Sequence, residues 1–552
     1  MKTKSILISY TGYPYSIRSL YLDNGLANLA SCLIREEHQT VIFDYSTVNI
    51  IKELFPQHLR EKWKRIMSLI REELKEHKDI NSDTVIYLGE LEKEIEEHKN
   101  NYIKKTAYEL ANYIKQNKID FIGFKLWAGE GFLGSIKLAE AVKRYVRIPV
   151  FGGGPQVDWF GELIFKATDA FDVLAYGEGE ETIVKLADYT TGKIELQEIP
   201  NIIYKASGNV VRTQKKLIED FNSIPLPNYE EDVYPSTKGN NKIKMISFEE
   251  CRGCPNSCNF CIHPRKSGRK WRVKDSKKVV EDIAQLVKKF NMRVFKFTGS
   301  NPPPFVKNEI AKEIINRKIN IRYSSFAHVK GMEIEDYRVL KESGCNALFF
   351  GVESGSDRIL KEAVNKPFRK KDIVKALKCC KESGISIITS IITPMPGETD
   401  ETLLETLNLL KETEPDLVLV NPPFLEPASK WAIENEKYGF KIENKEKLFY
   451  KEMMYITKFS YPAVLWDDLD GYKLNGITFK ESLNKAEEFS KVLMKEGLLS
   501  FGSDDLFLLS DSSNMEIKKL LKNVQESLLN ADYEKMQDLA KNINDKISNL
   551  DN

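Results

Sequence analysis

Residues 244–261 read KMISFEECRGCPNSCNFC, and this stretch decides the fold of the larger part of the chain. Its first residues, KMISFEE, contain a short apolar run that predicts a β-strand. The loop after the strand carries Cys254, Cys258 and Cys261 with the spacing C-x3-C-x2-C. Three thiolates on one short loop can hold three irons of a four-iron, four-sulfur cluster and leave the fourth iron open to a small molecule. The stretch therefore predicts a [4Fe-4S] cluster as the metal centre, with one reactive iron.

Cys251, in the same stretch, leaves a second interpretation open. As a fourth sulfur ligand it would close the loop into a structural zinc site. We favour the cluster because the cysteines follow a strand that opens a series of alternating strands and helices. The other cysteines, Cys32, Cys345, Cys379 and Cys380, lie in apolar sequence and are expected to be buried as small hydrophobic side chains.

The strand before the cysteines is the first of six predicted strands, with helices between them. The other five are expected at residues 293–300, 319–328, 346–354, 386–394 and 416–424. This alternation predicts a partial (β/α)6 barrel over residues 244–440, with its site at the carboxyl ends of the strands. Residues 441–552 lose the strand pattern and are rich in Lys, Glu and Leu, so we expect a mainly helical C-terminal domain.

Residues 1–214 show a second alternation of strands and helices. The strands are expected at residues 4–9, 40–46, 120–127, 148–155 and 171–180. This pattern predicts an α/β, doubly wound, Rossmann-like domain. A charged helical stretch at about residues 50–117 is interpreted as a solvated insertion without chemistry of its own. Prolines interrupt residues 215–243, which are therefore predicted to be a linker.

The composition fits a large multidomain protein. A length of 552 residues corresponds to about three or four domains. The 82 Lys and Arg against 81 Asp and Glu give a net charge of +1, so no global field attracts nucleic acid or an anionic membrane. No stretch approaches the roughly 20 apolar residues of a membrane span, and the N-terminus lacks a signal-peptide core. We therefore expect a cytoplasmic protein.

The cysteine spacing before a series of strands and helices resembles that of the radical S-adenosylmethionine (SAM) enzymes, and the resemblance extends through about residue 440. It implies that SAM chelates the open iron and is cleaved, by one electron, to methionine and a 5′-deoxyadenosyl radical. It also implies an electron donor such as flavodoxin or ferredoxin. Phe260 matches the aromatic position usual in this motif, and Glu353 and Ser354 match a strand end at which the family contacts its cosubstrate. A helix N-cap explains the neighbouring Ser356 equally simply.

The second strand departs from the family pattern. It ends in FTGSNPPPF, where many members carry an acidic motif that grips the methionyl amine. Thr298 and Ser300 offer neutral groups there, and we expect them to contact SAM. The third strand ends with His328, where related proteins often carry an arginine.

The N-terminal sequence resembles the cobalamin-binding domain that precedes the radical domain in one large subclass. The matching pieces lie at residues 22–46, 150–156 and 171–183. Glycines at strand ends allow the backbone to approach a large flat cofactor, although a nucleotide site or a plain turn would also explain a single glycine run. The residues expected against cobalamin are Gly152, Gly153, Gly154, Gly177, Glu178, Gly179 and Glu180. The D-x-H-x-x-G motif is absent, so no histidine is predicted as a lower axial ligand.

A dense basic run, HPRKSGRKWRVKDSKK, occupies residues 263–278. Because the net charge is balanced, we expect this run to attract small anions or to be structural, and not to bind RNA. Arg272 within it matches a position that is commonly basic in the family.

The resemblance implies a cobalamin-dependent radical SAM methyltransferase, which moves a methyl group from SAM through methylcobalamin to an unactivated carbon or phosphorus of a small-molecule or peptide substrate. The alternatives are a non-methylating rearrangement or cyclisation with the same cofactors, an RNA methylthiotransferase, and a zinc-stabilised RNA-binding module. No residue is assigned as catalytic, and no nucleic acid partner or membrane span is expected.

Overall fold

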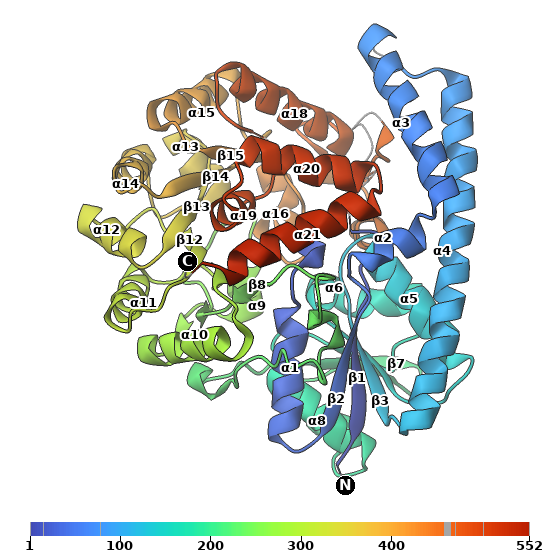
Figure 1. Cartoon of the computed structure of the whole chain (residues 1–552). Helices are drawn as coiled ribbons and strands as arrows, with labels where there is room; N and C mark the ends of the chain where they lie inside the picture. Colours follow the sequence, from blue (N-terminus) through green and yellow to red (C-terminus); the bar gives the residue numbers. More distant parts are fainter. Residues whose placement is uncertain are drawn as a thin grey trace.

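The computed structural model describes residues 2–14, 16–77, 79–456, 465–469, 471–500 and 502–550. Two largely parallel sheets form separate halves of the molecule, and the C-terminal helices lie across both halves (Figure 1). In the described part of the chain, no helix is long and apolar enough to cross a membrane.

The N-terminal sheet has seven strands in the order β2-β1-β3-β4-β5-β6-β7. The strands are β1 (Lys4–Ser9), β2 (Gln39–Asp44), β3 (Phe121–Lys125), β4 (Val150–Gly153), β5 (Val173–Ala175), β6 (Ile202–Ala206) and β7 (Asn209–Arg212). Strands β1 to β5 are parallel, whereas β6 and β7 add an antiparallel edge. Helices α1 (Asn24–Arg35) and α8 (Glu180–Thr190) share a core cluster with one face, and α5 (Glu130–Lys143) with the other. The predicted doubly wound domain is confirmed.

Three helices separate β2 from β3, where the charged insertion was expected. They are α2 (Asn49–Leu54), α3 (Gln57–His77) and α4 (Ser82–Asn117), and α3 and α4 form a long antiparallel pair at the side of the molecule (Figure 1). The insertion is not solvated on all sides. Trp63 of α3 is buried, and its indole N–H donates to the carbonyl oxygen of Leu529 at 2.8 Å. One face of the insertion therefore packs against the C-terminal helices.

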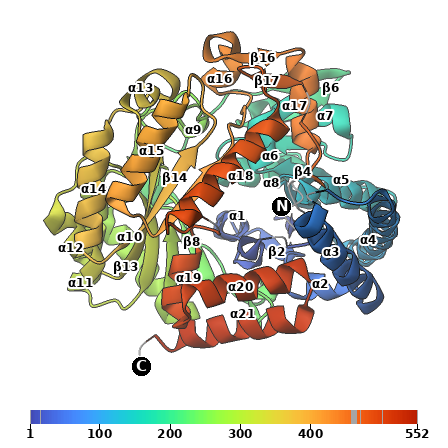
Figure 2. The same cartoon turned by 90° about the horizontal axis from the view of Figure 1, so that it is seen from above.

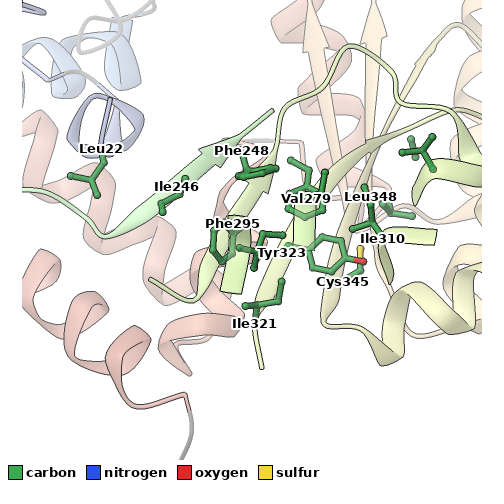
Figure 3. Close-up of a cluster of buried hydrophobic side chains, with 14 of the residues drawn as sticks. Leu22, Ile246, Phe248, Val279, Phe295, Ile310, Ile321, Tyr323, Cys345 and Leu348 are labelled. Atoms are coloured by element: carbon green, nitrogen blue, oxygen red, sulfur yellow. The ribbon is translucent and has the colours of Figure 1, made fainter. Parts of the chain in front are cut away.

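The second sheet contains six parallel strands in the order β15-β14-β13-β12-β11-β8. The strands are β8 (Met245–Phe248), β11 (Val294–Phe297), β12 (Arg322–Ala327), β13 (Cys345–Glu353), β14 (Ser386–Ile392) and β15 (Leu417–Asn421). The helices between them are α10 (Ser276–Phe290), α11 (Pro304–Asn316), α12 (Ile334–Glu342), α14 (Lys370–Glu382) and α15 (Asp400–Thr413). Phe248, Phe295 and Tyr323 of the strands pack in one cluster with Val279 and Ile310 of the helices (Figure 3). The predicted partial barrel is confirmed.

The C-terminal region closes the open side of this barrel. The backbone N–H of Val418 on β15 donates to the carbonyl of Leu499 at 2.9 Å. Lys296 of β11 donates to carboxylate oxygens of Asp504 and Asp505, each at 2.6 Å. These contacts anchor Leu499, Asp504 and Asp505 to strands of the barrel, so that the C-terminal region is an integral part of the fold.

Helices dominate the C-terminal region, as predicted, and Figure 2 shows α18 crossing the molecule above α20 and α21. The helices are α16 (Lys430–Ile433), α17 (Lys445–Met454), α18 (Phe479–Lys495), α19 (Leu506–Ser513), α20 (Ile517–Leu529) and α21 (Tyr533–Ser548). A small antiparallel ribbon, β16 (Phe440–Ile442) with β17 (Tyr472–Leu474), was not expected. Each of its strands has only three residues, too few to show a periodic pattern in the sequence.

Candidate active site

The cysteine loop leaves the barrel after β8 and is framed by a short antiparallel ribbon, β9 (Cys251–Arg252) with β10 (Arg272–Val273). The backbone N–H of Cys254 donates to the carbonyl of Gly268 at 3.0 Å, and that of Asn259 to the carbonyl of Val364 at 2.9 Å. Gly253 has a φ of 87°, and a Cβ atom there would lie 2.0 Å from the carbonyl oxygen of Lys270. The loop is therefore fixed by backbone contacts that require glycine at this point.

Cys254, Cys258 and Cys261 line one cavity of about 260 Å³ at the carboxyl ends of β11, β12 and β13, which we call the cysteine cavity. Cys251 is not among its lining residues, and its sulfur packs against Gly299, where a Cβ atom would lie 2.7 Å away. Cys251 thus lies outside the cavity that the other three cysteines line. Three thiols around one cavity fit a cluster that keeps an iron open. Burial raises the pKa of Cys261 to about 12, so metal binding must displace the thiol proton.

Glu353, at the end of β13, also lines the cysteine cavity. Its Oε1 accepts a hydrogen bond from Lys366 Nζ at 3.0 Å, and its Oε2 accepts one from Ser390 Oγ at 2.8 Å. Burial lowers the pKa of Lys366, but the Glu353 carboxylate and the nearby Cys258 sulfur raise it more, so that it lies above its usual value. The cavity therefore contains a buried ion pair whose lysine sequence reasoning missed, because no motif surrounds it.

The other residues expected at SAM do not all face the cysteine cavity. Phe260, Thr298 and Ser300 line it. Ser354 does not, because its hydroxyl lies 3.3 Å from Thr406 Oγ1 of α15 and is buried there. Its hydroxyl thus makes a contact between strand and helix, and its expected contact with SAM stays a prediction.

A second cavity, of about 330 Å³, opens at the carboxyl ends of β3, β4 and β5, and we call it the sheet cavity. It extends between the sheet and helices α1 and α8 as far as Leu7 of β1 and Leu186 of α8. The expected residues that line it are Gly152, Gly153, Gly154, Gly177, Glu178, Gly179 and Glu180. Glycines at the ends of two neighbouring strands, β4 and β5, leave backbone open to a large ligand, so this cavity fits an extended cofactor with a flat part.

Two of these residues carry charges that the protein itself pairs. Glu178 binds Arg272 through two hydrogen bonds, one of them at 2.9 Å, and Glu180 binds Arg252 through two, one of them at 3.2 Å. Burial alone would raise the pKa of Glu180, but the Arg252 guanidinium holds it below its usual value. We expected both carboxylates beside cobalamin. The structure places them at the cavity wall and directs them to arginines of the cysteine loop.

Four of the eight Lys and Arg side chains in the basic run at residues 263–278 form ion pairs within the chain: Lys266, Arg272, Lys274 and Lys278. Besides Arg272, Lys266 pairs with Asp158 at 2.7 Å, and Lys274 pairs with Asp282 at 3.0 Å. These pairs support the structural interpretation of the run rather than RNA binding.

Three residues line both cavities: His263, Thr298 and Ser300. His263 begins α9 (His263–Ser267), directly after the cysteine loop, and the other two follow β11. The two cavities are therefore neighbours that share one wall. Its position could not be predicted from the sequence, because it depends on how the two domains meet.

Comparisons with known proteins agree with this geometry. Residues 250–410 match the model of the radical SAM superfamily. An uncharacterised methyltransferase from Pyrococcus horikoshii is 27% identical over 56% of this chain and 68% of its own length. An anaerobic magnesium-protoporphyrin IX monomethyl ester cyclase from Rubrivivax gelatinosus is 28% identical over 48% of this chain and 49% of its own length.

The solved structure of TsrM, a radical SAM methyltransferase from Kitasatospora setae with cobalamin and a [4Fe-4S] cluster bound, superposes with a TM-score of 0.65. The superposition covers 98% of this chain and 99% of TsrM, at 13% identity. It thus includes the N-terminal sheet, the barrel and the C-terminal helices. Residues 250–410 are therefore similar to the radical SAM superfamily, and the chain as a whole has the fold of TsrM.

Proposed function

We propose that the protein is a cobalamin-dependent radical SAM methyltransferase that acts on an unactivated carbon or phosphorus of a small molecule or peptide. The observation that supports this most is the shared wall. A cavity with three cysteines and a glycine-lined cavity at a parallel sheet edge meet at His263, Thr298 and Ser300. A substrate at this junction can reach both cofactors, as methyl transfer by this chemistry requires.

Each cavity has residues suited to its cofactor. Cys254, Cys258 and Cys261 would hold the cluster, and the strand-end glycines of the sheet cavity would face cobalamin. When bound, SAM on the cluster supplies the radical, and cobalamin supplies the methyl group. The protein holds both cofactors in place and orients the substrate at the junction of the two cavities. An external electron donor, such as a flavodoxin or ferredoxin, belongs to this proposal.

A second candidate, a cyclisation or rearrangement without methyl transfer, is favoured by the similarity to the cyclase of Rubrivivax gelatinosus. An RNA methylthiotransferase is disfavoured, because its N-terminal domain is expected to carry cysteines for a second cluster. Here the N-terminal sheet domain contains only Cys32, which is buried in α1.

Product analysis separates the two candidates. The reconstituted protein is incubated with SAM, a reductant and a low-molecular-mass cell extract as the source of substrate. A methyltransferase should form S-adenosylhomocysteine together with 5′-deoxyadenosine. If extract stimulates 5′-deoxyadenosine alone, the reaction is a rearrangement or cyclisation, and methyl transfer is refuted.

A further inference from the structure

Three acidic residues of the N-terminal domain pair with three basic residues around the cysteine loop. Glu178 binds Arg272, Glu180 binds Arg252, and Asp158 binds Lys266. Of the acidic members, Glu178 lies in the loop before α8, Glu180 begins α8, and Asp158 lies on α6 (Pro155–Phe160). The basic members come from the β9–β10 ribbon and α9. We call these contacts the interdomain clamp.

The clamp is buried on its acidic side. The side chains of Glu178, Glu180 and Asp158 are 6%, 9% and 7% exposed, and those of Arg252 and Arg272 are 10% and 14% exposed. Loss of Glu178 would leave the Arg272 guanidinium without a carboxylate, which costs far more than loss of a surface pair. Loss of Glu180 would leave Arg252 with Glu249 of its own loop at 2.8 Å, and with Glu178 at 3.8 Å as its remaining partner in the N-terminal domain. The clamp therefore restricts the relative movement of its two sides.

Further hydrogen bonds extend the clamp on both sides. Asp158 also accepts from the backbone N–H of Gly177 at 2.6 Å, and Glu178 accepts from that of Ile218 at 2.6 Å. Arg272 donates to the carbonyl of Ser267, the last residue of α9, at 2.8 Å. The loop that contains Gly177 and Glu178, the linker at Ile218 and the cysteine loop are thus joined in one hydrogen-bond network.

The position of the clamp gives it a role in the site. Glu178, Glu180 and Arg252 line the sheet cavity. Arg252 and Arg272 form the ribbon that frames the cysteines, and Lys266 lies on the same short helix as His263 of the shared wall. A shift at any of these pairs would move the cysteine loop relative to the sheet cavity.

We propose that Glu178 and Glu180, although they belong to the N-terminal domain, position the iron-sulfur cluster of the barrel. In this proposal they do not bind the cobalamin of their own domain. Their carboxylates hold Arg272 and Arg252, and the arginines hold the two ends of the cysteine loop at a fixed distance from the sheet cavity. The inference rests on the proposed function, because it presumes that the cysteines bind a cluster.

The test compares E178Q and E180Q with the matched control E162Q. Glu162 belongs to the same domain and also binds an arginine, Arg212, at 2.8 Å, but this pair is exposed at the surface. Hydrogen–deuterium exchange of residues 251–273 is measured first in protein without cofactors. Exchange should be roughly tenfold faster or more in E178Q and E180Q, and unchanged in E162Q.

The second readout is the reconstituted cluster, measured as iron per chain and as the electron paramagnetic resonance spectrum of its reduced form with and without SAM. E178Q and E180Q should lose at least about half of the iron or show a changed spectrum with SAM. E180D keeps the charge and should recover the wild-type spectrum in part, which a merely structural defect would not do. Wild-type exchange, iron content and spectra in both Gln variants would overturn the inference.

The two proposals can fail separately. If the wild-type protein takes up no cluster, the proposed function fails. The exchange of residues 251–273 in protein without cofactors then still decides whether Glu178 and Glu180 hold the loop.

Discussion

The ion pair between Lys366 and Glu353 allows a quantitative prediction for K366M. The two side chains are 11% and 6% exposed, and removing one partner of a buried pair costs about 3–5 kcal/mol because the other charge remains unpaired. Ser390 still donates to Glu353 Oε2 and compensates part of this loss. We therefore expect K366M to destabilise β13 by about 3 kcal/mol.

The assay is native-state hydrogen exchange of the β13 amides in protein without cofactors, because a chain with several domains has no single unfolding free energy. The double variant E353Q/K366M removes both charges and should cost less than K366M alone. The control K375M breaks an exposed pair with Glu333 and should leave the exchange of β13 unchanged. If K366M costs no more than K375M, or if the effects of K366M and E353Q simply add, the buried pair does not have the energetic role assigned to it.

Three further predictions follow from single residues. Burial raises the pKa of Glu250 from 4.5 to about 7, so the folded protein holds a proton that the unfolded chain releases, and stability falls as the pH rises from about 4.5 to about 7. Native-state hydrogen exchange of the β8 amides, corrected for the intrinsic pH dependence of exchange, should show this fall in the wild type and lack it in E250Q, a difference worth ~3 kcal/mol in total; an unchanged pH dependence would refute the assignment. C258A should abolish cluster assembly, measured as iron per chain, whereas C251A should retain it; loss of iron in C251A would show that the ligands were misidentified. A175W fills the mouth of the sheet cavity and should reduce cobalt bound after gel filtration by roughly tenfold with normal iron; unchanged cobalt would place cobalamin elsewhere.

Much of the fold could be predicted because its signals are local. Apolar runs, helical periodicity and the spacing of Cys254, Cys258 and Cys261 each lie within a few residues. These local signals were sufficient to predict both sheets and the cysteine loop. Glu353 also followed from a local pattern, because a strand end places its side chain at the barrel mouth.

The contacts of the site were not predictable in the same way. Lys366 reaches Glu353 across a turn of helix, and Arg252 meets Glu180 from another domain, 72 residues away in sequence. No periodicity or motif links such residues, so the sequence indicated where Glu178 and Glu180 lie but not what they bind. The contact of Ser354 with the hydroxyl of Thr406, on a later helix, could not be predicted for the same reason.

Metal content decides whether the two cavities hold the two proposed cofactors. The protein is purified without oxygen, its cluster is reconstituted, it is incubated with hydroxocobalamin, and iron and cobalt are measured after gel filtration. We predict about four irons and one cobalt per chain. Iron without cobalt would contradict the two-cofactor site, and zinc in place of iron would contradict the radical SAM centre itself.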